Sequence, residues 1–168
     1  MSPLYILMGV SGSGKSFIGK KLADVLKCSF VEGDDYHSQS NKDKMHKGNP
    51  LDDMDRHQWL NELKTYIESS SDTFVLSCSA LKKSYRKVLQ TENHQTIFIH
   101  LELPTETLKK RLESRKGHFF SPSLLDDQLE TLESITTEEN GFTVYVDRDS
   151  EKIIAEIKTK LDDMQNHK

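Results

Sequence analysis

Five short apolar segments recur along the chain, separated by longer stretches with helical spacing. The segments typical of strands are 4–8, 29–31, 73–78, 96–101 and 142–146. The first is continuously apolar, as expected of a parallel strand covered on both faces. Apolar residues three and four positions apart predict helices over 15–27, 56–68, 82–89, 105–114, 123–133 and 150–164, and a helical turn over 42–47. This alternation predicts an α/β fold with a parallel sheet.

Length and composition limit the classes of protein. The chain has 168 residues, of which 35% are hydrophobic and 30% charged, so we expect a single domain over 1–168. A net charge of -4 provides no basic excess for nucleic acid. The run from Leu4 to Val10 is too short to cross a membrane. Cys28 and Cys78 cannot form a disulfide framework, which favours a reducing, cytoplasmic setting.

One segment matches the phosphate-binding pattern G-x-x-x-x-G-K-[ST] at every position: Gly9, Val10, Ser11, Gly12, Ser13, Gly14, Lys15 and Ser16. It follows an apolar strand and opens a helix, which is the setting that the motif requires. Glycines let the backbone N–H groups surround phosphate oxygens. Lys15 is expected to reach the β- and γ-phosphates, and the Ser16 hydroxyl to join the Mg²⁺ shell. A flexible surface turn is the alternative.

The carboxylate that usually follows the third strand in such proteins is missing, because residues 77–79 read Ser-Cys-Ser. Asp34, after the second strand, would lie at the ligand-binding edge of an α/β sheet and could support the metal instead. A turn residue is the alternative for Asp34. The segment 41–44 reads Asn-Lys-Asp-Lys and lacks the final Asp of the guanine-selective pattern, so ATP is the favoured donor.

Four further segments occur in a specific order: GDDYH at 33–37, GNPLDDMDRHQWL at 48–60, CSALKKSYR at 78–86 and RKGHFF at 115–120. Together with the phosphate loop they resemble the gluconokinase family over residues 4–147, small P-loop kinases that phosphorylate D-gluconate on its 6-hydroxyl. Asp35 and Tyr36 depart from the family, whose members commonly carry two apolar residues there.

The resemblance implies a nucleoside-monophosphate-kinase-like fold, with a five-stranded parallel sheet in the order 2-3-1-4-5, helices on both faces and a lid. It also implies ATP and Mg²⁺ as cosubstrates and a homodimer. The product, 6-phospho-D-gluconate, would enter the pentose phosphate route. Another kinase of this fold, acting on shikimate or a nucleotide, is the closest alternative. A non-catalytic nucleotide switch is an alternative from a different class.

The resemblance also implies roles for acceptor-site residues. Asp34 would accept the proton of the attacking hydroxyl or hold a metal-bound water. His37 and Asn41 would bond sugar hydroxyls, although a lone histidine is often structural. The substrate carboxylate suits a bidentate arginine, for which Arg56 and Arg86 are unranked candidates. Lys82 is a further candidate for substrate binding, and structural ion pairs are the alternative for these cations.

In a kinase of this kind, Arg111 would pack against adenine and Arg115 would meet the transferring phosphate. Solvated surface charge is the alternative for both, and the favoured reading for Lys116. We expect residues 115–122 to form a lid, with His118 and two phenylalanines, Phe119 and Phe120, closing over the substrates.

Overall fold

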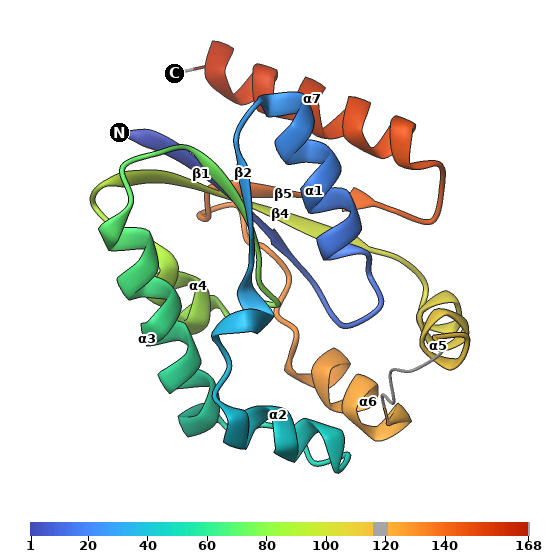
Figure 1. The fold of residues 1–168 in the computed structure, drawn as a ribbon. Coiled ribbons are helices and arrows are strands. Elements are labelled where there is room, and N and C mark those ends of the chain that lie inside the picture. The colour runs from blue at the N-terminus through green and yellow to red at the C-terminus, as the bar shows by residue number, and fades with distance from the viewer. Residues whose placement is uncertain (116–120, 168) are drawn as a thin grey trace.

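The computed structural model describes residues 1–115 and 121–167, which form a parallel sheet with helices on both faces (Figure 1). The strands are β1 (Ser2–Met8), β2 (Ser29–Glu32), β3 (Phe74–Ser77), β4 (His94–Glu102) and β5 (Gly141–Tyr145). Their order is β2-β3-β1-β4-β5, and every pairing is parallel. The predicted topology is therefore confirmed. The continuous apolar run of β1 is buried because this strand is central in the sheet.

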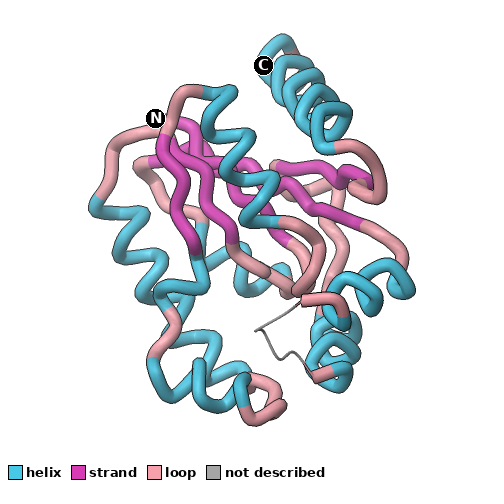
Figure 2. Tube along the Cα trace, turned by 45° about the vertical axis from the view of Figure 1, so that its right-hand side comes forward, coloured by secondary structure: helices cyan, strands magenta, loops and turns pink. Residues whose placement is uncertain are grey.

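Two helix pairs cover the sheet. One face carries α1 (Lys15–Leu26) and α7 (Ser150–Asn166), and the other carries α3 (Asp53–Ser69) and α4 (Lys83–Leu89) (Figure 1). Three further helices lie beyond the strand ends: α2 (Gln39–His46), α5 (Thr105–Glu113) and α6 (Pro122–Thr131) (Figure 2). Because parallel strands all end at one edge, the loops that follow them converge where α/β proteins bind ligands.

Helix α3 begins at Asp53, three residues before the start predicted at Arg56. The difference comes from capping. The Asp52 carboxylate accepts a hydrogen bond from Asp55 N, and the Asp55 carboxylate accepts one from Asp52 N. Helix α2 also begins earlier than predicted, with Ser38 as its cap. Apolar spacing misses such first turns because polar capping residues form them.

A short 3-10 helix, η1 (Gly33–Tyr36), follows β2 and was not predicted from the sequence. A Cβ atom on Gly33 would lie 2.1 Å from the carbonyl oxygen of Ser77, so only glycine allows this close approach to β3. Trp59 of α3 donates from Nε1 to the Gly33 carbonyl oxygen at 2.8 Å. These contacts fix η1 between β3 and α3, and thereby fix the position of Asp34.

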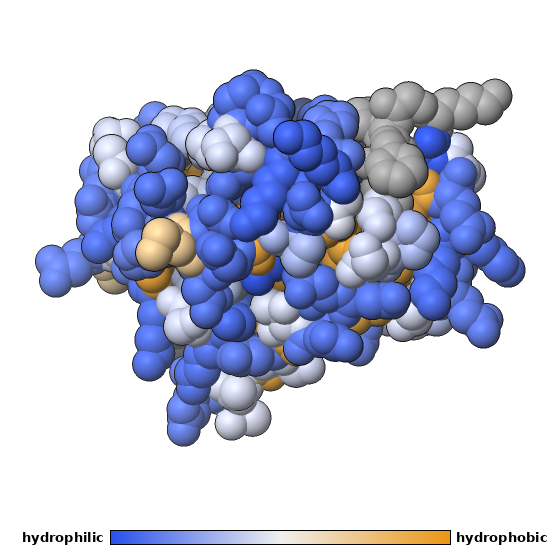
Figure 3. All heavy atoms as spheres, turned by 90° about the horizontal axis from the view of Figure 1, so that it is seen from below, coloured by the Kyte–Doolittle hydropathy of each residue, from blue (hydrophilic) through white to orange (hydrophobic). Residues whose placement is uncertain are grey.

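The face beyond the strand ends is mainly hydrophilic, and most of the apolar residues visible on it lie in recessed places between polar ones (Figure 3). Among residues 1–115 and 121–167, no helix has both the length and the apolar character needed to cross a membrane.

Candidate active site

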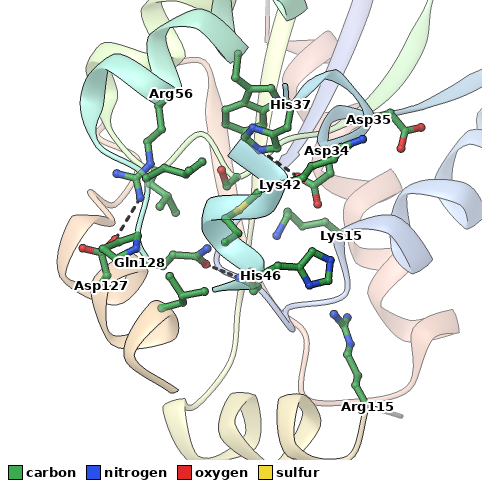
Figure 4. Close-up of a pocket in the computed structure, with 18 residues that line it drawn as sticks. Lys15, Asp34, Asp35, His37, Lys42, His46, Arg56, Arg115, Asp127 and Gln128 are labelled. Carbon is green, nitrogen blue, oxygen red and sulfur yellow. Dashed lines mark hydrogen bonds and ion pairs between the residues drawn. The ribbon is translucent and has the colours of Figure 1, made fainter. Parts of the chain in front are cut away.

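A cavity of about 400 Å³ lies at the edge of the sheet, with walls from the phosphate loop, η1, α2, α3 and α6 (Figure 4). Its charged lining includes four cationic side chains, Lys15, Lys42, Arg56 and Arg115. Three aspartates also line it: Asp34, Asp35 and Asp127. The cations come from four separate parts of the chain, so the fold concentrates positive charge in one place. Such a cavity suits anionic ligands.

The phosphate loop has the backbone geometry that anion binding requires. Gly12 and Gly14 have φ values of 85° and 91°, in the left-handed region that glycine readily adopts. Within the described chain, the N–H groups of Gly12, Gly14 and Lys15 have no hydrogen-bond partner. Helix α1 follows with no acidic residue in its first turn. The loop therefore presents open donors at a positively polarised helix end.

Lys15 is folded back onto this loop. Its Nζ donates to the carbonyl oxygens of Gly9 and Val10, each at 3.0 Å. Burial lowers the pKa of Lys15, while the nearby Asp34 carboxylate opposes the shift. Figure 4 shows Lys15 and Asp34 on the same side of the cavity. Lys15 of the phosphate loop and the candidate base Asp34 therefore lie on the same side of the cavity.

Glu32, which the sequence analysis missed, ends β2 beside the phosphate loop. Its carboxylate accepts hydrogen bonds from the hydroxyl of Ser16 and, at 2.6 Å, from that of Ser77. The signal that could have revealed it is an acidic residue at the carboxyl end of the second strand. Oxygen donors of this kind suit Mg²⁺, which commonly takes few protein ligands together with phosphates. No cluster of three or more metal-ligating side chains occurs in the described part of the chain.

Asp34 lies in η1 and lines the cavity, with 73% of its side-chain surface exposed. Its Oδ1 is 3.9 Å from Nε2 of His37. Although solvent reaches the carboxylate, the surrounding walls partly desolvate it and raise its pKa, and Lys15 opposes that shift. A carboxylate with a raised pKa that faces a cavity can serve as a proton acceptor.

His37 is a buried wall of the cavity. Its ring stacks on Trp59 with centroids 4.1 Å apart and an interplanar angle of 18°. Burial lowers the pKa of His37 to about 4, so the ring is neutral near pH 7. Asn41, the other predicted hydroxyl-binding residue, does not line the cavity: its buried amide lies 3.4 Å from His37 Nδ1 and donates to Asp55 O at 3.1 Å. Asn41 therefore supports the His37 ring.

The structure distinguishes the two candidate arginines. Arg86 is 1% exposed, and its Nε and Nη2 donate to the two carboxylate oxygens of Glu139 at 2.5 and 3.2 Å. Its Nη1 donates to the carbonyl oxygens of Ala80 and Leu81 at 2.9 and 3.3 Å. The prediction that Arg86 binds substrate is therefore wrong, because these groups occupy its guanidinium inside the protein.

Arg56 lines the cavity instead. Its Nη2 lies 3.2 Å from Oδ2 of Asp127, and its Nη1 lies 3.5 Å from the Tyr85 hydroxyl. Lys82 does not line the cavity, and its Nζ pairs with Asp53 at 2.9 Å. Of the two candidates Arg56 and Arg86, Arg56 is therefore the one that a ligand carboxylate in the cavity can reach.

On the donor side, Arg111 of α5 donates from Nη1 to the Gly12 carbonyl oxygen at 3.2 Å, next to the phosphate loop. Arg115 lines the cavity, on the side opposite Arg56 (Figure 4). The predicted roles of Lys116, His118, Phe119 and Phe120, and most of the expected lid, lie outside the described residues.

The polar cavity residues that the sequence did not single out include Asp35, Lys42, His46, Asp127 and Gln128. Lys42 and His46 are four positions apart on α2, so the helical turn predicted over 42–47 already placed them on one face, but nothing in the sequence showed that this face meets the cavity. Asp127 and Gln128 follow no recognisable pattern. Gln128 accepts a hydrogen bond on Oε1 from Ser11 N at 2.8 Å, which holds α6 against the phosphate loop.

Residues 11–140 match the model of the shikimate kinase family. A probable gluconokinase of Xenopus tropicalis is 42% identical, with 95% of this chain and 93% of that protein covered. Thermoresistant gluconokinase of Escherichia coli (strain K12) is 38% identical, over 90% and 89% of the two chains. Among solved structures, a gluconokinase from Sinorhizobium meliloti 1021 has a TM-score of 0.78 at 39% identity, covering 92% and 88%. Shikimate kinase from Aquifex aeolicus has a TM-score of 0.63 at 17% identity, covering 96% and 98%, which shows the fold alone.

The sheet order, the phosphate loop and the family model define a P-loop kinase with the shikimate kinase fold. Within this class, relatives that are 36–43% identical over most of the chain are named as gluconokinases or probable gluconokinases. The chain belongs to the gluconokinase family.

Proposed function

We propose that the protein transfers the γ-phosphoryl group of ATP to the 6-hydroxyl of D-gluconate, giving 6-phospho-D-gluconate and ADP. The observation that carries this proposal is the single cavity containing Lys15 of the phosphate loop, the carboxylate of Asp34 and the guanidinium of Arg56. These groups match the three needs of the reaction: a phosphate cradle, a proton acceptor and a partner for the substrate carboxylate.

The donor phosphates bind the open N–H groups of the phosphate loop, and Lys15 leaves the loop carbonyls to meet them. The Ser16 hydroxyl would hold Mg²⁺, with the carboxylates of Glu32 and Asp34 nearby. When bound, the ion would neutralise charge on the transferring phosphate. Arg115 adds positive charge from the opposite wall. Arg111 supports the adenine side from its position beside Gly12.

At the acceptor end, Arg56 binds the gluconate carboxylate and His37 bonds a sugar hydroxyl as a neutral ring. Asp34 accepts the proton of the attacking hydroxyl as that oxygen approaches the phosphorus. Its raised pKa makes it a better proton acceptor than an ordinary aspartate. The carboxylate end and the reacting end of the substrate therefore contact different walls of the cavity.

The relatives' names support gluconate as the substrate. The length supports a single kinase domain, and the two cysteines favour a cytoplasmic setting. The family resemblance implies a homodimer whose product enters the pentose phosphate route. A coupled ADP-release assay with Mg-ATP should show turnover with gluconate well above that with shikimate, glucose or nucleoside monophosphates. Preference for another of these acceptors would reject the proposed substrate, and loss of all acceptor-dependent ADP release would reject the enzyme. Size-exclusion chromatography with light scattering tests the dimer.

A further inference from the structure

The ion pair between Arg56 and Asp127 joins helices α3 and α6 across one wall of the cavity (Figure 4). The two charged atoms are 3.2 Å apart, and both residues line the cavity. No motif or resemblance pointed to Asp127. Its carboxylate has the same chemistry as the group that the proposed substrate would present to Arg56.

The two partners differ in their access to water. The Arg56 side chain is 11% exposed and that of Asp127 is 34% exposed. A guanidinium that is largely removed from water needs an anion beside it, whereas a carboxylate at the cavity wall can rotate into solvent at smaller cost. When a second carboxylate arrives, Asp127 is therefore the partner that leaves.

The backbone around Asp127 is held while this exchange occurs. The next residue, Gln128, accepts a hydrogen bond from Ser11 N at 2.8 Å. Helix α6 is thereby docked on the phosphate loop, so release of Asp127 needs only a change of its side-chain rotamer. The exchange requires no rearrangement of α6.

We propose that Asp127 is an internal competitor of the acceptor carboxylate: it neutralises Arg56 before the substrate binds and yields that position to gluconate. The inference rests on the proposed function. It makes Asp127 a specificity-determining residue that acts through Arg56 without touching the substrate. An acceptor that carries a carboxylate forms a new ion pair with Arg56 in place of the one between Arg56 and Asp127 that it breaks. A neutral polyol breaks the same ion pair and forms none.

The test replaces the charge of Asp127 and follows gluconate binding by calorimetry and by steady-state kinetics. Asp127→Asn should lower the Kd and KM for gluconate by about fivefold, as loss of a competing pair of about 1 kcal/mol predicts. The KM should change much more than kcat. Asp127→Glu keeps a competing carboxylate and should stay near the wild-type KM.

The neighbouring Asp126 provides a matched control, because it is exposed on the same helix and does not line the cavity. Asp126→Asn removes the same charge and should leave the KM unchanged. In an Arg56→Gln background, Asp127→Asn should have no effect on gluconate binding, since the competition requires the guanidinium.

A higher KM in Asp127→Asn would overturn the inference, because Asp127 would then orient Arg56 for the substrate. An unchanged KM, or an equal fall in Asp126→Asn, would overturn it as well. Failure of the proposed function is a different result: the wild-type protein would neither bind gluconate nor phosphorylate it.

Discussion

Arg86 and Glu139 form a two-point ion pair inside the protein, with Nε to Oε1 at 2.5 Å and Nη2 to Oε2 at 3.2 Å. Their side chains are 1% and 7% exposed. Burial alone would raise the pKa of Glu139, but hydrogen bonds from Arg86 and from Thr136 outweigh it and lower the pKa. The pair ties α4 to the segment before β5, which gives Arg86 a structural role.

Removing one charge of this pair should therefore affect stability. Glu139→Gln leaves the buried guanidinium without its counter-ion, and the free energy of unfolding should fall by about 3 to 5 kcal/mol. Urea unfolding measures the change. The exposed pair of Lys83 with Glu138 provides the control, and Glu138→Gln should barely alter the midpoint. Equal effects of the two substitutions would contradict a special role for the buried pair.

Lys15→Ala should lower kcat by about 100-fold or more, because a positioned cation at the transferring phosphate is lost. The fold should persist, because among the residues that the structure describes the Nζ of Lys15 donates hydrogen bonds only to carbonyl oxygens of the phosphate loop. Circular dichroism checks the fold and the coupled assay checks the rate. Lys20→Ala removes an exposed cation from the same helix and should retain activity. Wild-type turnover in Lys15→Ala would reject the assignment of the phosphate loop.

Glucose should be a poorer acceptor than gluconate by at least about tenfold in kcat/KM, because Arg56 would have no substrate carboxylate to bind. Arg56→Gln should reduce this ratio, mainly through a higher KM for gluconate. The ratio is measured with both sugars at several concentrations. Similar values of kcat/KM for the two sugars in the wild-type protein would show that Arg56 does not bind the carboxylate of gluconate.

The parallel sheet could be predicted from sequence because five apolar runs alternate with helical segments along the chain, and the resemblance to a known family implied the order of its strands. The choice between Arg56 and Arg86 could not. Both lie in predicted helices, over 56–68 and 82–89, and the deciding contact is with Glu139, 53 positions after Arg86. Asp127 was missed for the same reason, since only the folded chain brings α6 against α3.

His37 should make stability depend on pH in the acid range. Its pKa is about 4 in the folded protein against 6.5 in the unfolded chain, so the unfolded state binds more protons between these values. The contribution of the neutral ring, up to about 3 kcal/mol, is fully present above pH 6.5 and is lost as the pH falls toward 4. Denaturant unfolding across this window measures it.

The comparison that isolates this contribution uses His37→Gln, which should show a flatter dependence of unfolding free energy on pH. His57 is exposed on α3, and His57→Gln should follow the wild-type curve. If His37→Gln and the wild-type protein lost stability in parallel, the buried ring would not be the group that titrates.

Asp34→Asn removes a charge with almost no change of shape, so it tests whether the carboxylate acts in the reaction. As a proton acceptor or metal support, its loss should lower kcat by about 100-fold or more. Stability should not fall, because the raised pKa of Asp34 means that the fold disfavours its charged form. In the wild-type protein, the pH at which kcat falls on the acid side of its pH profile should be higher than the ordinary pKa of an aspartate.

Asp35 is the matched control for this substitution, since it adjoins Asp34 in η1 and also lines the cavity. Asp35→Asn should keep most of the wild-type kcat and leave the pH at which kcat falls on the acid side unchanged.

If Asp34 were only a turn residue, asparagine could make similar bonds to the backbone, and both rate and melting temperature would stay near wild type. Retention of more than about a tenth of kcat at saturating gluconate and Mg²⁺ would therefore exclude Asp34 as the base. The proton would then have to pass to another carboxylate of the cavity wall, such as that of Asp35.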